Sequence, residues 1–246
     1  MERLALDRFA TPWLRYQHVA RYRWACQWAP GAVVLDAACG SLYGSRLLQQ
    51  AGARRVVALD RSPDAFEEGE RAGNLSGLSA ALADVAQLPL PSSTIDLYLS
   101  FETIEHVRPD AEVLGEAWRV LKPGGRFVCS TPNRDLLSPG NRLDDTPLNP
   151  YHVREYSIGE FVELMSGEFE QIELFAQTSF SAGHRRALAV AGRISNRLAV
   201  RWHQIRNLTS WPVQSEARHL PVPLETLEAS HEACEVVIAV GTKQRT

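Results

Sequence analysis

The feature that most constrains the fold of this chain is a regular alternation of short apolar runs with segments of helical pattern. Runs rich in β-branched residues and bounded by turn residues are typical of buried strands. Strands that alternate with helices predict a mostly parallel sheet. The expected strands span 32–36, 55–59, 80–83, 95–100, 126–130, 169–175 and 235–240, and the expected helices span 11–28, 45–51, 63–72, 111–121 and 157–165.

We therefore predict an α/β fold with a doubly wound, seven-stranded, mostly parallel sheet. The 246 residues suffice for one such domain with a sizeable core, so a single domain over 1–246 is expected. Within it, residues 1–30 are expected to form an N-terminal helical cap. Residues 179–231 are expected to form a helical or irregular insertion before the last strand.

The distribution of charged and cysteine residues indicates the compartment. No apolar run approaches the roughly 20 residues that span a bilayer. Residues 1–22 mix charged and apolar side chains and lack the continuous apolar region of a secretory signal. The four cysteines are scattered without a C-x-x-C pair, so neither a metal site nor a disulfide framework is expected. A reducing cytoplasm is the expected location.

Candidate site residues follow the predicted strands, because ligands of doubly wound sheets bind at the carboxyl ends of the strands. After the first strand, Asp36 precedes a small-residue turn in which Gly40 and Gly44 allow close approach of the backbone. A plain strand-to-helix turn is the alternative. Asp60, twenty residues after Gly40, is placed to accept both hydroxyls of a ribose, with a helix N-cap as the alternative. Asp84 follows the third strand, where an acid can accept from an adenine amino group.

The order of these motifs resembles that of class I S-adenosylmethionine (SAM)-dependent methyltransferases, from Val33 to about Phe175. The resemblance implies a Rossmann-like fold with SAM as cofactor. It also implies that the loop after the first strand holds the methionine part, Asp60 the ribose and Asp84 the adenine. Residues 121–125 resemble the turn before the fifth strand in this family. The cofactor-binding positions expected on this basis are Asp36, Ala38, Gly40, Asp60, Arg61, Asp84, Val85, Phe101, Glu102 and Arg21.

Three further segments, 100–107, 130–134 and 149–156, are similar to a bacterial branch found among glycan, O-antigen or natural-product biosynthesis enzymes. Residues 18–22 resemble the N-terminal helix of that branch, which is expected to cover the SAM site. The resemblance implies methyl transfer to an oxygen or nitrogen of a small molecule or glycan. A sugar, a nucleotide-sugar or a natural product would be such an acceptor.

The residues after the fourth strand are candidates for catalysis, because the transferred methyl group is expected there. His106 is a candidate general base, since an unperturbed imidazole titrates near neutral pH. His152 is a candidate second base in a Pro-rich loop, and Glu105 completes the catalytic set. The alternative for His106 is a helix-end histidine bonded to backbone.

Leu42 departs from the family pattern, because it stands where the middle glycine of Gly-x-Gly-x-Gly usually lies. That glycine often allows a positive φ. The substitution keeps a second hypothesis open: a SAM-fold protein with non-methylating chemistry or a non-catalytic partner role. A third hypothesis, a nicotinamide-dependent oxidoreductase, lacks support because Gly40 and Gly44 do not match the Gly-x-Gly-x-x-Gly fingerprint.

A basic segment follows the sixth predicted strand. Residues 174–215 contain six arginines and no acidic residue, although the whole chain has a net charge of −3. Helical spacing over 184–208 leaves three interpretations: a surface helix at a homodimer or lid contact, a cationic wall for an anionic substrate, or a contact with anionic lipid. Nucleic acid is not an expected partner, because the net charge is negative and no RNA-binding module is visible.

Overall fold

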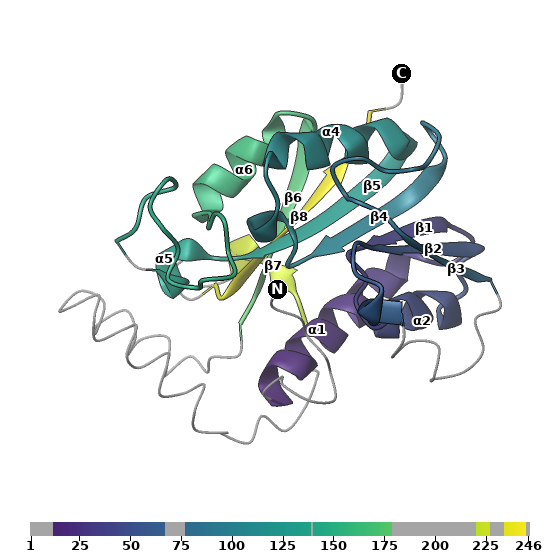
Figure 1. The fold of residues 1–246 in the computed structure, drawn as a ribbon, viewed down its shortest axis with the longest axis horizontal. Coiled ribbons are helices and arrows are strands. Elements are labelled where there is room, and N and C mark those ends of the chain that lie inside the picture. The colour runs from purple at the N-terminus through teal and green to yellow at the C-terminus, as the bar shows by residue number, and fades with distance from the viewer. Residues whose placement is uncertain (1–11, 67–76, 139, 179–219, 227–233, 245–246) are drawn as a thin grey trace.

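The computed structural model describes residues 12–66, 77–138, 140–178, 220–226 and 234–244. Its centre is one eight-stranded sheet with the order β3-β2-β1-β4-β5-β8-β6-β7 (Figure 1). The strands are β1 (Val33–Ala37), β2 (Arg55–Asp60), β3 (Leu78–Leu82), β4 (Ile95–Phe101), β5 (Leu121–Pro132), β6 (Gln171–Gln177), β7 (Val222–Pro223) and β8 (Val236–Thr242).

The direction of the strands defines where a ligand can bind. Strand β1 pairs in parallel with β2 on one side and with β4 on the other, and β4 pairs in parallel with β5. The chain order thus reverses between β1 and β4, which is the switch point at which doubly wound sheets bind ligands. Strand β8 runs antiparallel to both β5 and β6.

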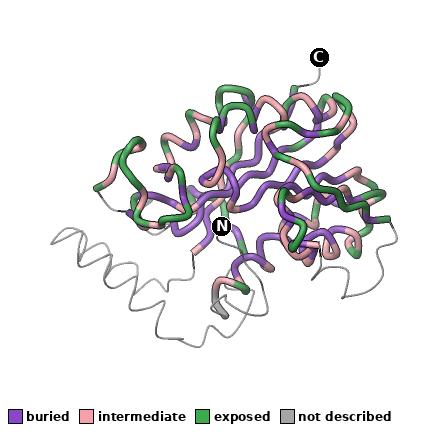
Figure 2. The backbone as a smooth tube through the Cα atoms, viewed as in Figure 1, coloured by how far each residue is buried: buried purple, intermediate pink, exposed green. Residues whose placement is uncertain are grey.

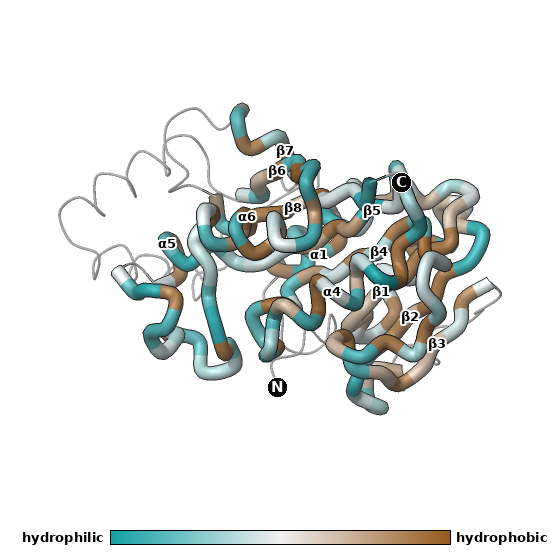
Figure 3. Tube along the Cα trace, turned by 90° about the horizontal axis from the view of Figure 1, so that it is seen from above, coloured by the Kyte–Doolittle hydropathy of each residue, from teal (hydrophilic) through white to brown (hydrophobic). Residues whose placement is uncertain are grey.

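Helices cover both faces of the sheet. Helices α1 (Pro12–Ala25) and α2 (Tyr43–Gln50) pack together on one face, while α4 (Asp110–Val120) and α6 (Ile158–Ser166) lie on the other (Figure 1). Alternate strand residues feed two hydrophobic clusters, one per face, because successive side chains of a strand point to opposite sides. The central strands are accordingly buried (Figure 2), and hydrophobic residues concentrate in β1 and β2 (Figure 3).

Short elements complete the described chain. Helix α6 begins at a capping box, in which Ser157 and Glu160 satisfy each other's backbone N–H groups. The remaining elements are η1 (Cys26–Trp28), η2 (Ile104–His106), α5 (Arg134–Leu137) and η4 (Leu224–Thr226).

The structure confirms the mostly parallel sheet and corrects two features of the prediction. The sheet has eight strands instead of seven, because β7 pairs with the edge of β6 inside the expected insertion at 179–231. Strand β5 begins at Leu121, so the expected turn at 121–125 belongs to the strand as an irregularity. The register jumps there from Ile95↔Leu121 to Leu97↔Arg126.

Some predictions fall on residues outside the described parts. The expected helix at 184–208 with its six arginines lies there, as do most of the insertion at 179–231 and residues 1–11 of the expected cap. Of the helix expected at 63–72, residues 64–66 are helical and residues 67–72 lie outside. Among the described residues, no helix combines the length and apolar character needed to cross a membrane.

Candidate functional site

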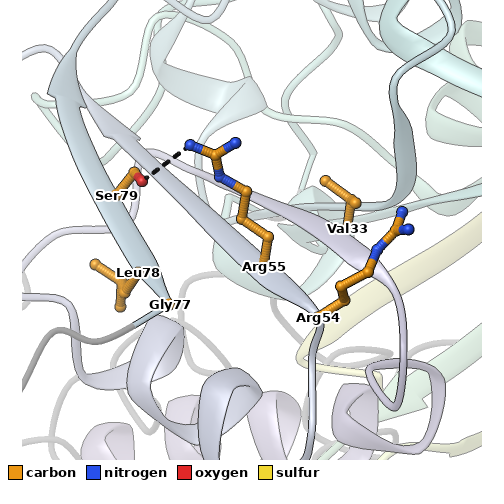
Figure 4. Close-up of a pocket in the computed structure, with 6 residues that line it drawn as sticks. All are labelled: Val33, Arg54, Arg55, Gly77, Leu78 and Ser79. Atoms are coloured by element: carbon orange, nitrogen blue, oxygen red, sulfur yellow. Dashed lines mark hydrogen bonds between the residues drawn. The ribbon is translucent and has the colours of Figure 1, made fainter.

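The structure brings the expected residues together at the carboxyl edge of β1, β2 and β4. Asp36 in β1 lies opposite Ala58 in β2 and Leu99 in β4, and the three strands end nearly level. The residues that follow each strand therefore share one edge of the sheet. The opposite edge carries a cavity of about 500 Å³ lined by Val33, Arg54, Arg55, Gly77, Leu78 and Ser79 (Figure 4).

The loop after β1 is held against the end of β2. The backbone N–H of Gly40 donates to Oδ2 of Asp60 at 3.0 Å, and that of Ser62 donates to Oδ1 at 2.9 Å. Ala38 and Gly40 have φ values of 56° and 55°, so the loop turns sharply. A Cβ added to Gly40 would meet no heavy atom within 4 Å. The glycine backbone thus borders open space beside the Asp60 carboxylate.

Leu42 has a left-handed backbone conformation, which glycine adopts readily and other residues rarely do. Its φ is 63°, and it immediately precedes helix α2. Its side chain is fully buried in the hydrophobic cluster that includes Tyr22 and Leu48. The substitution therefore preserves the course of the loop and places the added side chain in the core.

Asp36 is a buried anchor beneath this loop. Its Oδ1 accepts from the Tyr22 hydroxyl at 2.8 Å, and its Oδ2 accepts from the Ser45 hydroxyl at 2.5 Å. Burial raises the pKa of Asp36 to about 6, although both hydrogen bonds act to lower it. Asp36 therefore ties α1 and α2 to the end of β1.

The loop after β3 completes this side of the site. The N–H of Ala83 donates to the carbonyl of Asp60 at 3.0 Å, which fixes the loop against β2. Asp84 is exposed and accepts from the N–H of Ala86 through Oδ1 at 2.9 Å, whereas Val85 is buried in the core. Arg61 is exposed at the end of β2.

The buried Arg21 and the half-buried Glu102 form an ion pair at this edge of the sheet. The fully buried Arg21 contacts Glu102 with 3.0 Å between Nη1 and Oε1, and its guanidinium lies 5.5 Å from the centre of the Phe101 ring. The same guanidinium donates to the Ser130 hydroxyl at 2.8 Å and to Oε1 of Gln177 at 2.9 Å and 3.1 Å. Arg21 thus joins α1 to three strands. Glu102 has a φ of 52° directly after β4.

The two candidate bases lie side by side. His106 ends η2, and His152 lies in the segment between α5 and α6. Their ring centres are 4.9 Å apart in an edge-to-face arrangement. The two segments are joined because the carbonyl of Glu105 accepts from the N–H groups of Val153 and Arg154 at 2.8 Å and 3.2 Å.

Each histidine ring is oriented through its Nδ1 atom. The Nδ1 of His106 lies 2.8 Å from the carbonyl oxygen of Tyr151, and that of His152 lies 2.7 Å from Oε1 of Glu155. Glu155 is itself buried and also accepts from Ser138. Arg154, the neighbour of Glu155, forms an ion pair with Asp110. The carboxylate of Glu155 is thus the partner of His152 and not of Arg154.

Glu105 is the third member of this group. Its side chain is fully buried; Oε2 accepts from the Thr131 hydroxyl at 3.1 Å, and Oε1 has no hydrogen-bond partner in the described structure. Burial, and then the neighbouring Glu102 carboxylate, raise the pKa of Glu105 well above its usual value.

Several contributors to the site went unpredicted. Four of them form hydrogen bonds with residues distant in the sequence: Tyr22, Ser130, Thr131 and Gln177. The fifth, Glu155, orients the ring of the nearby His152. A signal existed for four of these residues, because segments 18–22, 130–134 and 149–156 resemble the bacterial branch and contain Tyr22, Ser130, Thr131 and Glu155. Gln177 lies at the end of β6 without any comparable motif.

The strand order and the loop geometry define a Rossmann-like fold of the class I methyltransferase type. Residues 35–129 match a family model described as "Methyltransferase domain". The S-adenosylmethionine-dependent methyltransferase structure from Mesorhizobium loti superposes with a TM-score of 0.56 at 17% identity, over 89% of this chain and 96% of that one. This likeness concerns the fold.

Sequence relatives extend the similarity beyond that domain model. A Mycolicibacterium smegmatis protein described as "Probable S-adenosylmethionine-dependent methyltransferase" is 38% identical over 164 residues, which cover 65% of this chain and 60% of the relative. A Mycobacterium tuberculosis protein of the same description is 35% identical over 153 residues, covering 62% of this chain and 53% of the relative. The matches thus span between half and two thirds of these relatives. Both relatives are described as S-adenosylmethionine-dependent methyltransferases, and the similarity to each covers only part of its length.

Proposed function

We propose that this chain is a SAM-dependent methyltransferase that moves a methyl group to an oxygen or nitrogen of a small molecule or glycan. Sugars, nucleotide-sugars and natural products are the proposed acceptors. One observation carries the proposal: the Gly40 N–H is hydrogen-bonded to Asp60 beside open space. A glycine loop and an acid at the ends of adjacent parallel strands form the arrangement that binds a nucleoside.

The residues present fit the cofactor. Each oxygen of Asp60 accepts one backbone N–H and retains acceptor capacity for a ribose hydroxyl. The open side of Gly40 leaves room for the methionine part, while exposed Asp84 and buried Val85 suit an adenine amino group and ring face. When bound, SAM supplies an electrophilic methyl group on a sulfonium. Ala38 and Arg61 belong to the loops after β1 and β2, and are proposed to border the cofactor there.

Arg21, Asp36, Phe101 and Glu102 support the site from behind in this proposal. Arg21 neutralises Glu102, and Asp36 fixes the base of the loop through Tyr22 and Ser45. Through these contacts the side chains fix the positions of the loops that follow β1 and β4. We therefore expect their removal to disturb cofactor binding indirectly.

The acceptor would lie against Glu105, His106 and His152. A hydroxyl acceptor must lose a proton as it attacks the methyl carbon, whereas an amine needs mainly alignment. The Nδ1 of His106 faces a carbonyl oxygen, so Nδ1 carries the hydrogen and Nε2 carries the lone pair. Nε2 is therefore the proposed proton acceptor, and His152 has the same orientation toward Glu155.

The competing hypothesis, a SAM-fold protein that does not methylate, depended on Leu42. Because Leu42 keeps a φ of 63° and buries its side chain, the loop conformation is not lost. That observation favours ordinary cofactor binding over a degenerate site.

Calorimetric titration with SAM and S-adenosylhomocysteine tests the proposal. We expect the native protein to bind at micromolar strength, about −8 kcal/mol. Asp60→Ala should weaken binding at least tenfold, while Glu112→Ala, which removes an exposed acid from α4, should leave it unchanged. If the native protein binds neither ligand but Leu42→Gly gains binding, the methyltransferase proposal gives way to a non-catalytic role.

A further inference from the structure

We propose that Glu105, His106 and His152 form a binding site for one divalent transition-metal ion, such as Zn²⁺ or Mn²⁺. The inference rests on the proposed function and deepens it, because the ion would take the place of the histidine nitrogens in activating the acceptor. Each of the three residues offers one ligand atom, and these atoms all lie within 4.8 Å of one another.

The hydrogen bonds of the two histidines make Nε2 the candidate ligand atom of each ring. A carbonyl oxygen and a carboxylate can only accept here, so the Nδ1 atoms of His106 and His152 both carry hydrogen toward Tyr151 and Glu155. Both Nε2 atoms then carry lone pairs. Metal-binding histidines characteristically donate their second ring N–H to a carboxylate or a backbone carbonyl, which fixes the tautomer and the ring.

Glu105 supplies an independent observation. Its side chain is fully buried, Thr131 satisfies Oε2, and Oε1 has no hydrogen-bond partner in the described structure. A buried carboxylate oxygen without a partner destabilises the folded state, because it has lost its hydrogen bonds to water and gained none in return. A cation coordinated beside the two histidines would satisfy this oxygen.

The donor set selects the kind of ion. Two imidazoles and one carboxylate suit zinc, manganese, iron, cobalt or nickel better than magnesium or calcium, which prefer all-oxygen sites. Three protein ligands leave coordination positions open, as in catalytic zinc sites. An acceptor hydroxyl bound at an open position would lose its proton to water more readily. Its oxygen would then form the bond to the methyl carbon as the carbon–sulfur bond breaks toward sulfur.

Asn149 competes with the ion for one ligand atom. Its Nδ2 lies 2.9 Å from Nε2 of His152, and its Oδ1 accepts from the N–H of Tyr151 at 3.0 Å, so the amide is oriented to donate. Coordination requires this amide to turn aside. We therefore expect Asn149→Ala to bind the ion at least as tightly as the native protein.

The test is titration of chelator-treated full-length protein with Zn²⁺, Mn²⁺ and Co²⁺, by calorimetry and by the visible absorption of Co²⁺. We expect one ion per chain. Glu105→Gln and His106→Ala should each weaken binding at least tenfold, whereas Glu112→Gln, which alters an exposed carboxyl group, should not. Circular dichroism establishes that each variant is folded.

Two further measurements keep the outcome clear. In the native protein, Zn²⁺ should shift the ¹⁵N resonances of Nε2 in two histidines, a readout that needs no variant. SAM binding is titrated on the same samples. If SAM binds but no ion does, or if ion binding survives both ligand substitutions, the metal site is overturned and the proposed function stands. If the ion binds and SAM does not, the proposed function fails.

Discussion

At the scale of single residues, Leu42 and Asp36 each adopt a state that their residue type disfavours. Leu42 has a left-handed backbone, which for an L-residue other than glycine costs roughly 1–2 kcal/mol. Asp36 places a carboxyl group in an almost fully buried position. In both cases the surrounding contacts hold the residue in place: the core around Leu42 and two hydroxyls on Asp36.

For Leu42, we predict an unusual order of stability among variants. Leu42→Ala loses a buried side chain, at about 2–5 kcal/mol, and keeps the strained φ. Leu42→Gly loses the same burial but relieves the strain, so it should be the more stable of the two although it is smaller. Denaturant unfolding of both variants measures the difference. A glycine variant less stable than the alanine variant would contradict the strained conformation.

For Asp36, we predict a pH-dependent contribution to stability. The pKa is raised from 3.8 to about 6 in the folded state. The unfolded chain therefore loses this proton first as pH rises, and the stability contributed by Asp36 falls between about pH 4 and 6, by about 3 kcal/mol in total. Unfolding free energies of native protein and Asp36→Asn, measured across this range, should converge or cross by that amount. A constant difference would contradict the prediction.

Residue types and their spacing allowed the arrangement at the ends of β1 and β2 to be predicted, whereas the binding and catalytic roles of these residues stay predictions. Asp60 and Gly40 were identified because an acid and a glycine at the ends of successive parallel strands must meet at one edge, and they do so at 3.0 Å. The burial of Arg21 and its hydrogen bonds to Ser130 and Gln177 were not predictable, because these partners lie 109 and 156 residues away in the sequence. That no metal site is expected was inferred from cysteine spacing, which carries no information on a group formed by Glu105 and His106 of η2 and the distant His152. That expectation stays a prediction.

At the scale of elements, the contact between α1 and α2 depends on a missing side chain. Gly44 lies in α2 directly under the Tyr22 ring of α1, and Tyr22 also packs edge-to-face on Tyr43 and Phe101. This close approach brings the Tyr22 hydroxyl to Asp36. The position of α1 over the loop after β1 is thus set by one glycine.

We predict that Gly44→Ala destabilises the protein and weakens SAM binding. The added Cβ would stand 2.2 Å from ring atoms of Tyr22, and overpacking of this kind costs about 1–3 kcal/mol. Gly115→Ala is the matched control, because that glycine also lies in a helix, α4, and its added Cβ meets nothing within 4 Å. The control should be neutral or more stable by up to about 1 kcal/mol. Thermal unfolding distinguishes the two.

The elements also show where sequence patterns stop being informative. The described helix ends lie within a few residues of the predicted ones, because Pro, Gly and Ser residues mark them. The end expected at residue 72 lies outside the described residues. Strand β7 has two residues, too few for any periodicity, and it exists only because the edge of β6 offers hydrogen bonds. The irregular start of β5 likewise depends on its neighbour β4, not on its own composition.

At the scale of the whole molecule, we predict a gradient of backbone stability across the sheet. Strands β1 and β4 have partners on both sides and are buried, whereas β3 lies at one edge with four of its five residues exposed. Amide hydrogen exchange should therefore be slowest in β1 and β4 and fastest, among the described strands, in β3 and β7. Equal protection of β3 and β4 would show that the sheet does not open from its edges.

The ion pair of Arg21 and Glu102 has a consequence for how the two halves of the site communicate. One guanidinium on α1 holds the residue that follows β4, and Glu105 lies three positions further along the chain. A movement of α1 away from the sheet would separate Arg21 from Glu102 and change the electrostatic potential at Glu105. If binding of the nucleoside changes the affinity for a ligand at Glu105 by some factor, that ligand changes the affinity for the nucleoside by the same factor. A structural ion pair is in this sense a reciprocal coupling between two binding equilibria.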